Sequence, residues 1–204
     1  RRSWCVYPSA RIYHGTPLGA TFSSEALVGA YSGSFDGIDD RVVIAGIPPS
    51  PASFTLACWI KLPDLTTAKT IYAGSSGDLG FYVDALNRIG LGKVAVSEVT
   101  SNVAITNTGR HHLAVTSIVG TSVSFYLDGI FDITKSFNSI YPGGTKNLGR
   151  RSDDGPSAYF KGLMDEVGLW NRQLSAEEIA ELAGISPPSS SQNRSRQMRA
   201  TFFR

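Results

Sequence analysis

The feature that most constrains this chain is a series of short apolar segments of similar length, each ended by turn-forming residues. Gly-Ser, Asn-Arg, Thr-Gly and Asp-Gly pairs separate the segments. Strands this short and this regularly spaced are typical of a β-sandwich or jelly roll. We therefore predict an all-β fold of two antiparallel sheets, with strands at 54–61, 70–73, 79–83, 88–91 with 93–96, 98–105, 112–118, 122–127 and 130–133.

Two places in the series predict specific hairpins. Asp128-Gly129 lies between two apolar runs, and this pair accepts the positive φ angles of a tight type I′ turn. Residues 34–35 and 42–44 are expected to pair across the turn at 36–40, and residues 21–31 to form a first edge strand. The chain is thus expected to build its sheets largely from neighbouring strands.

The stretch 159–182 predicts a strand, its exit turn and a helix start. Large apolar residues fall on both parities of the strand, which indicates a position inside a sheet. Ser175 and Glu178 have the spacing of a capping box, and Leu174 can form a hydrophobic staple with Ile179. Gly184, followed by two prolines, is expected to end this short helix.

Four phrases in this order resemble the laminin G-like, concanavalin A-like jelly-roll family. They are SFDGIDD at 34–40, FTLACWIK at 54–61, HHLAVT at 111–116 with FYLDG at 125–129, and the closing stretch 159–182. The resemblance covers roughly residues 30 to 184. It implies a lectin-like jelly roll with one short C-terminal helix, and a carbohydrate- or surface-binding, adhesion-type module at an extracellular or virion surface.

Charge divides the chain into a body and two basic ends. The ends, 1–20 and 186–204, hold seven arginines and no acidic residue, which leaves 12 basic against 17 acidic residues for the body. We predict an N-terminal arm at 1–20, a jelly-roll domain at 21–185 and a basic tail at 186–204. Such ends are either solvated or bind an acidic partner surface. The tail residues expected to dock a partner are Arg194, Arg196, Arg199, Phe202 and Phe203.

The basic ends support an alternative function. The chain could be a structural or decorating subunit of a large virion-like or extracellular assembly, docked onto neighbouring subunits through both ordered ends. Nucleic-acid binding is the least favoured interpretation, because the tail has four positive charges and no accompanying motif. No apolar run approaches the ~20 residues of a membrane-spanning helix, so no membrane span is expected.

Catalysis is not expected. The sequence contains no E-x-D-x-x-E arrangement, no G-x-S-x-G, no H-E-x-x-H and no C-x-x-C motif. Asp165 and Glu166 are strand neighbours and point to opposite faces, as do His111 and His112. We therefore predict a protein that is not an enzyme.

Calcium is the candidate cofactor. Asp36, Asp39 and Asp40 crowd one turn and offer the hard oxygen ligands that Ca²⁺ takes. The resemblance implies that Asp165 lies near this turn, so Asp36 and Asp165 are the expected ligands of a structural ion. The alternative is a turn that needs no metal, because Asp side chains accept hydrogen bonds from their own backbone.

The expected ligand-binding site is the long rim loop at 141–157 and its surroundings, since loops on rigid sandwiches often carry binding residues. A loop that only closes the edge of the sandwich is the alternative. The cluster expected to bind a glycan or cell-surface ligand consists of Tyr141, Asn147, Arg150, Arg151, Asp153, Asp154 and Tyr159.

The two cysteines are too few for a disulfide framework. Cys58 lies inside an apolar strand and is expected to be a small buried hydrophobic residue. A bridge to Cys5 would suit an oxidising compartment, but nothing in the spacing supports it.

Overall fold

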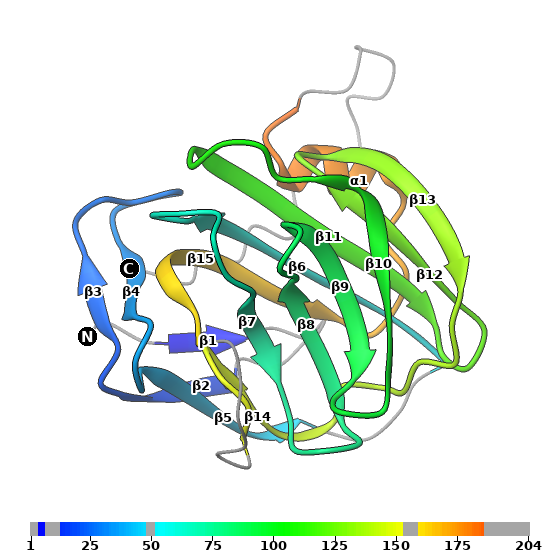
Figure 1. Ribbon diagram of the computed structural model, residues 1–204, viewed down its shortest axis with the longest axis horizontal. Helices are drawn as coiled ribbons and strands as arrows, with labels where there is room; N and C mark the ends of the chain where they lie inside the picture. The colour runs from blue at the N-terminus through cyan, green and yellow to red at the C-terminus, as the bar shows by residue number, and fades with distance from the viewer. Residues whose placement is uncertain (1–3, 7–12, 48–51, 153–158, 186–204) are drawn as a thin grey trace.

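Residues 4–6, 13–47, 52–152 and 159–185 are described by the computed structural model of the chain (Figure 1). Their regular structure is mostly strand. The elements in chain order are β1 (Trp4–Val6), β2 (Tyr13–Leu18), β3 (Thr21–Ser23), β4 (Ser32–Asp36), β5 (Arg41–Ile47), β6 (Ser53–Lys61), β7 (Lys69–Ala73), β8 (Leu79–Val83), β9 (Arg88–Lys93), β10 (Ser97–Ala104), β11 (Arg110–Ile118), β12 (Ser122–Leu127), β13 (Ile130–Ser136), β14 (Gly144–Leu148), β15 (Lys161–Trp170) and α1 (Ala176–Leu182).

In the described residues the strands form two antiparallel sheets. The front sheet has the order β1-β2-β5-β14-β7-β8-β9-β10, and the back sheet has the order β13-β12-β11-β6-β15-β4-β3. Figure 1 shows β7 to β10 in front of β6, β11 and β12. The predicted antiparallel jelly-roll sandwich with one short C-terminal helix is confirmed for this part of the chain.

The core lies between the inner faces of the two sheets. Phe81 and Leu91 from the front sheet and Leu56 and Phe125 from the back sheet belong to one buried cluster, each with 1% or less of its surface exposed. Alternate residues of each strand face this core, so the residues between them point to the outer faces of the sandwich.

Strand β15 is interior to the back sheet, as predicted. It pairs with β6 on one side and with β4 on the other. The predicted capping box is also confirmed, since Ser175 accepts from the backbone of Glu178 and the Glu178 side chain accepts from the cap backbone. Helix α1 then packs on the outer face of the back sheet, in a cluster formed by Ala57, Ala114, Tyr126, Leu174 and Ile179.

The predicted pairing of residues 34–35 with 42–44 is wrong. Strand β4 lies in the back sheet and β5 in the front sheet, so the acidic turn at 36–40 carries the chain from one sheet to the other. Strand β4 pairs instead with β3 and with β15, and Asp36 lies opposite Lys161 of β15. A turn rich in Asp and Gly can close a hairpin or connect two sheets. Here β4 pairs with the distant strand β15, so the turn connects the two sheets.

Other expectations differ in detail. The predicted strand at 93–96 ends at Lys93, and residues 94–96 form a turn in which Ala95 has a φ of 60°. The expected arm contributes β1 and β2, and β2 pairs with β5. Residues 21–31 provide only the short edge strand β3.

The hairpin at Asp128-Gly129 is confirmed, with φ angles of 51° and 77° at the two turn residues. Cys58 is free and buried, as expected for a small apolar residue, and burial raises the pKa of its thiol. In the described residues no helix is both long and apolar enough to cross a membrane. The predicted docking residues Arg194, Arg196, Arg199, Phe202 and Phe203 lie outside the described residues, so their role stays a prediction.

Candidate functional site

Small residues in register form a trough on the outer face of the front sheet. Ala73 pairs with Gly80, and Gly80 pairs with Gly92 on the next strand. The neighbours of these glycines, Phe81 and Leu91, belong to the core, so positions 80 and 92 face outward. We call the floor formed by Ala73, Gly80 and Gly92 the glycine trough.

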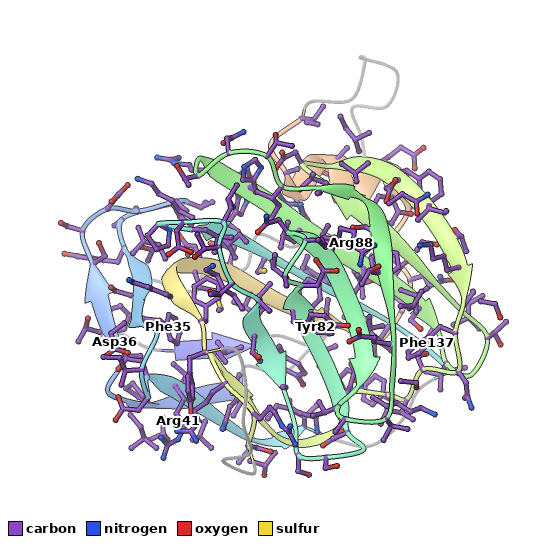
Figure 2. The ribbon with its side chains drawn as sticks, in the orientation of Figure 1. Phe35, Asp36, Arg41, Tyr82, Arg88 and Phe137 are labelled. Atoms are coloured by element: carbon purple, nitrogen blue, oxygen red, sulfur yellow. The ribbon has the colours of Figure 1, made fainter. Side chains whose placement is uncertain are left out.

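Tyr82 lies beside this floor with its ring against Gly90, its cross-strand partner. A Cβ atom added to Gly90 would lie 2.2 Å from Cε2 and 2.3 Å from Cζ of the Tyr82 ring. The ring therefore occupies the space that a side chain at position 90 would fill. Figure 2 shows Tyr82 over the middle of the front sheet.

Glu98 fixes the orientation of this ring. The Tyr82 hydroxyl donates a 2.6 Å hydrogen bond to Oε2 of Glu98, and Glu98 is the cross-strand partner of Gly92. Burial, followed by the hydrogen bond to Glu98 and the charge of Glu98, raises the pKa of Tyr82. The phenol therefore stays protonated and keeps this hydrogen bond around neutral pH.

The trough and the ring open into a pocket of about 450 Å³. This volume lies in the range of small-molecule sites, which combine an apolar lining with a few polar groups. The polar residues of the lining are Thr70, Tyr82, Lys93, Ser97, Glu98 and Arg151. Most of the remaining lining is small or apolar, and the turn at 94–96 contributes Val94, Ala95 and Val96 to it.

Of the predicted ligand-binding cluster, Arg151 lines this pocket. Four other members make contacts within the fold: Tyr141 packs edge-on against Phe54, the Asn147 side chain donates to the carbonyl of Arg151 at 3.1 Å, and the Arg150 guanidinium lies 5.2 Å from the ring centre of Tyr159. Asp153 and Asp154 lie outside the described residues. Ligand binding by the cluster stays a prediction.

The acidic turn gathers carboxylates that suit a hard cation. Asp36, Asp39 and Asp40 each offer an oxygen, and these atoms lie within 4.8 Å of one another. Oδ1 of Asp36 also accepts from the backbone of Ile38, and Oδ2 of Asp40 accepts from the backbone of Asp36, both at 2.8 Å. Burial, with the charges of Asp36 and Asp39, raises the pKa of Asp40. These residues fit Ca²⁺, which would balance their mutual repulsion.

Asp165 does not join this cluster. The partner of Asp36 is Lys161, so Asp165 lies four positions further along β15, about 13 Å away along the strand. Its side chain is fully buried, and its two oxygens accept from the backbones of Val28 and Glu166 at 2.8 and 2.9 Å. The implied position of Asp165 near the acidic turn is therefore wrong, because the register of β15 with β4 separates the two.

The burial of Asp165 has an electrostatic consequence. Burial raises the pKa of this carboxyl to about 6, although the backbone N–H groups of Val28, Glu166 and Leu27 and the charge of Arg110 lower it. Arg110 also donates to the carbonyl of Leu27 at 2.9 Å. Asp165 thus holds residues 27–28 against the back sheet.

The two antiparallel sheets thus form a jelly-roll sandwich with an open pocket on one outer face. A family model described as the concanavalin A-like lectin/glucanases superfamily matches residues 36–180. The chain belongs to this superfamily. A comparison with curated proteins finds no match.

Several solved structures share the fold. Domain 4 of AbnA, a GH43 extracellular arabinanase from Geobacillus stearothermophilus in complex with arabinotriose, has a TM-score of 0.66 at 16% identity over 83% of this chain and 88% of that one. The botulinum neurotoxin serotype G binding domain gives 0.64 at 12% identity over 90% of this chain and 50% of that one, so this chain spans half its length. A SAP-like pentraxin from Limulus polyphemus gives 0.58 at 17% identity over 74% and 80%.

Sequence reasoning missed Tyr82, Glu98 and the trough. The signal was present, because glycine occupies alternate positions at Gly90 and Gly92, and Gly80 precedes Tyr82 by two residues. Glycine inside a strand often marks a place where a ligand or another chain segment approaches closely. Gly80 lies opposite Gly92 when β8 and β9 pair, and the two glycines leave a shallow hollow beside Tyr82.

Proposed function

We propose that the chain is a non-catalytic carbohydrate-binding module and that the glycine trough with Tyr82 is its site. The observation that carries the proposal is the Tyr82 ring, packed against Gly90 and tied to Glu98, beside a floor without large side chains. A fixed aromatic ring offers an apolar face to the C–H groups of a sugar, and nearby polar groups can bind its hydroxyls.

The comparisons support this proposal at the level of the fold. The arabinanase domain is described in complex with arabinotriose, and a further structure of the same fold is described as a putative carbohydrate binding protein from Bacteroides ovatus. A fold hosts many functions, so the argument depends on the trough itself. An extracellular location, as inferred from the resemblance, belongs to the same proposal.

The number of carboxylates in the pocket lining supports a non-catalytic role. Glycoside hydrolysis typically uses two carboxyl groups about 5 to 9.5 Å apart across the scissile bond. In the described residues the pocket lining holds one carboxylate, Glu98, and it accepts the hydrogen bond of Tyr82. We therefore expect binding without turnover of oligosaccharides.

The test is a glycan array, followed by isothermal titration calorimetry on each glycan that binds. Tyr82→Ala should lower the affinity at least about tenfold, since it removes a stacking surface worth about 1.4 kcal/mol. Tyr82→Phe should stay within about threefold because it keeps the ring. Gly90→Ala should weaken binding, since the new methyl group displaces the ring.

Tyr159→Ala is the matched comparison, because it removes one of the two aromatic residues of the rim cluster predicted from the sequence. We expect its glycan affinity to equal that of the wild type. Loss of binding in Tyr159→Ala with retention in Tyr82→Ala would place the site on the rim loop instead. An array with no bound glycan would reject the proposed function.

A further inference from the structure

The turn that borders the trough has an unusual composition. Val96 donates to the carbonyl of Lys93 at 2.8 Å and closes a tight turn around Val94 and Ala95. Ala95 adopts a φ of 60°, a conformation that favours glycine or asparagine. The hairpin between β11 and β12 closes in the same way, through Thr121 and Ile118, and has Gly120 at the equivalent position with a φ of 76°. An apolar residue in a strained position points to a use for the side chains displayed there.

These side chains form a firm apolar wall for the pocket. Two backbone hydrogen bonds hold the turn against the end of β8: Val94 donates to the carbonyl of Asp78 at 2.7 Å, and Gly77 donates to the carbonyl of Val94 at 2.8 Å. A Cβ atom on Gly80 would lie 3.1 Å from Cγ2 of Val94, so Val94 stands directly beside the trough floor. Val96 lines the same pocket and is 66% exposed.

The pocket thus has two different sides. Tyr82, Glu98 and Thr70 can exchange hydrogen bonds with hydroxyl groups, whereas Val94 and Val96 of the turn present methyl groups. Lys93 and Ser97 flank this turn and also line the pocket. A sugar hydroxyl placed directly against Val94 and Val96 would leave water without gaining a new partner, which is unfavourable. A methyl or acetyl group in the same place would gain apolar contact instead.

We propose that the pocket selects a sugar unit that carries a methyl or acetyl group, and that this group packs against Val94 and Val96. The inference rests on the proposed function, because it assigns a substrate class to the same trough. The substituent points to the turn at 94–96, and the sugar ring stacks on Tyr82.

Matched pairs of oligosaccharides test the selectivity by isothermal titration calorimetry. The pairs are chitotriose with cellotriose, acetylated with deacetylated xylotriose, and L-fucose with L-galactose. In a pair that binds, the substituted member should bind about fivefold more tightly or better, since one buried methylene equivalent is worth about fourfold in affinity. Equal affinities, or tighter binding of the unsubstituted member, would overturn the inference.

Val96→Thr tests the role of the turn, because it changes one exposed methyl group to a hydroxyl at constant shape. We expect a loss of about fourfold for the substituted sugar and no change for its partner. Val103→Thr, on β10 and also exposed, should change neither affinity. An equal effect of Val96→Thr on both members would refute the contact.

The outcomes separate this inference from the proposed function. Glycans that bind in a Tyr82-dependent way without preference for methyl or acetyl groups would leave the function in place and reject the selectivity. If the array binds only unsubstituted glycans, the proposed function likewise stands and the selectivity is rejected. If no glycan binds, both proposals fail.

Discussion

The outer faces of the two sheets differ in how they are used. On the back sheet, α1 covers the outward side chains of Ala57, Ala114 and Tyr126. Residue Thr55 joins the segment before the helix to β6, since it donates to the carbonyl of Arg172 at 2.8 Å and accepts from the backbone of Leu174 at 2.9 Å. On the front sheet, the outward positions of β8 and β9 hold Gly80, Gly90, Gly92 and Tyr82, and a pocket opens above them.

This difference separates stability from binding. A glycine in a strand interior costs about 0.5 to 1 kcal/mol relative to alanine, so the trough weakens the fold unless it has a use. The covered face fills its outward positions with side chains that pack or form hydrogen bonds. Substitutions on the covered face should therefore change the free energy of unfolding, and substitutions at the trough should change affinity.

The largest expected effect is on the covered face, at Ile179 of α1. Its side chain is fully buried, and Ile179→Ala should lower the free energy of unfolding by about 3 kcal/mol through lost burial and a cavity. Urea unfolding measures this change. Ile185→Ala, at a residue that is 43% exposed just after the helix, is the control and should have a much smaller effect. Glycan affinity of the folded Ile179→Ala protein should be unchanged. A weakened affinity would contradict the division into a face that stabilises the fold and a face that binds.

Two buried titratable groups on the covered face should respond to acid in opposite directions. His112 and Asp165 are both cross-strand partners of Trp59. Burial lowers the pKa of His112 to about 4 from 6.5, so this group lowers stability as the pH falls from 6.5 to 4. Burial raises the pKa of Asp165 to about 6 from 3.8, so this group raises stability as the pH falls from 6 to 3.8. Each effect is about 3 kcal/mol, and together they largely cancel.

Single variants should expose the two effects. Relative to the wild type, His112→Leu should gain about 3 kcal/mol in the free energy of unfolding between pH 6.5 and pH 4, and Asp165→Asn should lose a similar amount between pH 6 and pH 4. Urea unfolding at a series of pH values measures both differences. Differences that do not vary with pH would show that these groups do not titrate as the burial of the two side chains implies.

At the trough, Gly80→Val should reduce affinity and leave stability nearly unchanged. Valine suits a strand, and its Cβ requires Val94 to shift by a few tenths of an ångström. The added side chain fills the floor, so glycan affinity should fall at least about tenfold, which is about 1.4 kcal/mol. Calorimetry with thermal unfolding checks both quantities. Ala45→Val on β5, also exposed, should alter neither, and full affinity in Gly80→Val would exclude the trough as the site.

The smallest expected effect is that of calcium at the acidic turn, on the opposite side of the molecule from β10. Figure 2 places Asp36 on that side, well away from Tyr82. Millimolar calcium should raise Tm by about 2 to 4 °C, because a weak extracellular-type site contributes about 1 kcal/mol. Glycan affinity should not change. Differential scanning calorimetry with calcium and with chelator measures the shift, and Asp39→Asn should reduce it. An equal Tm in both conditions would reject the metal site.

The sequence predicted what neighbouring residues determine. Asp128-Gly129 predicted its hairpin and Ser175 with Glu178 predicted the helix start, because a turn or a cap depends on a few adjacent residues. The sheet crossing after β4 was missed, because its partner β15 lies more than a hundred residues away in the chain. Val94 and Val96 favoured a strand, and the turn prevailed through hydrogen bonds to another hairpin.

The candidate site was harder to predict for a physical reason. Arg151 was the predicted residue found at the pocket, because a long polar side chain is recognisable without its surroundings. The trough exists because its floor residues have small side chains or none. Such residues form a hollow only if their neighbours on the paired strands are also small, and the sequence does not show which strands pair. Gly80 and Gly92 look like turn residues until the pairing of β8 with β9 makes them one floor.

The central position of β15 also bears on how the protein is made. A nascent chain that ends before residue 161 leaves β4 and β6 each with one open edge, and open edges promote association with other chains. Pairing over so long a stretch of chain is slow to form. The back sheet can therefore be completed only after nearly the whole domain has left the ribosome, and truncation within 161–170 should give aggregated protein instead of a smaller folded unit.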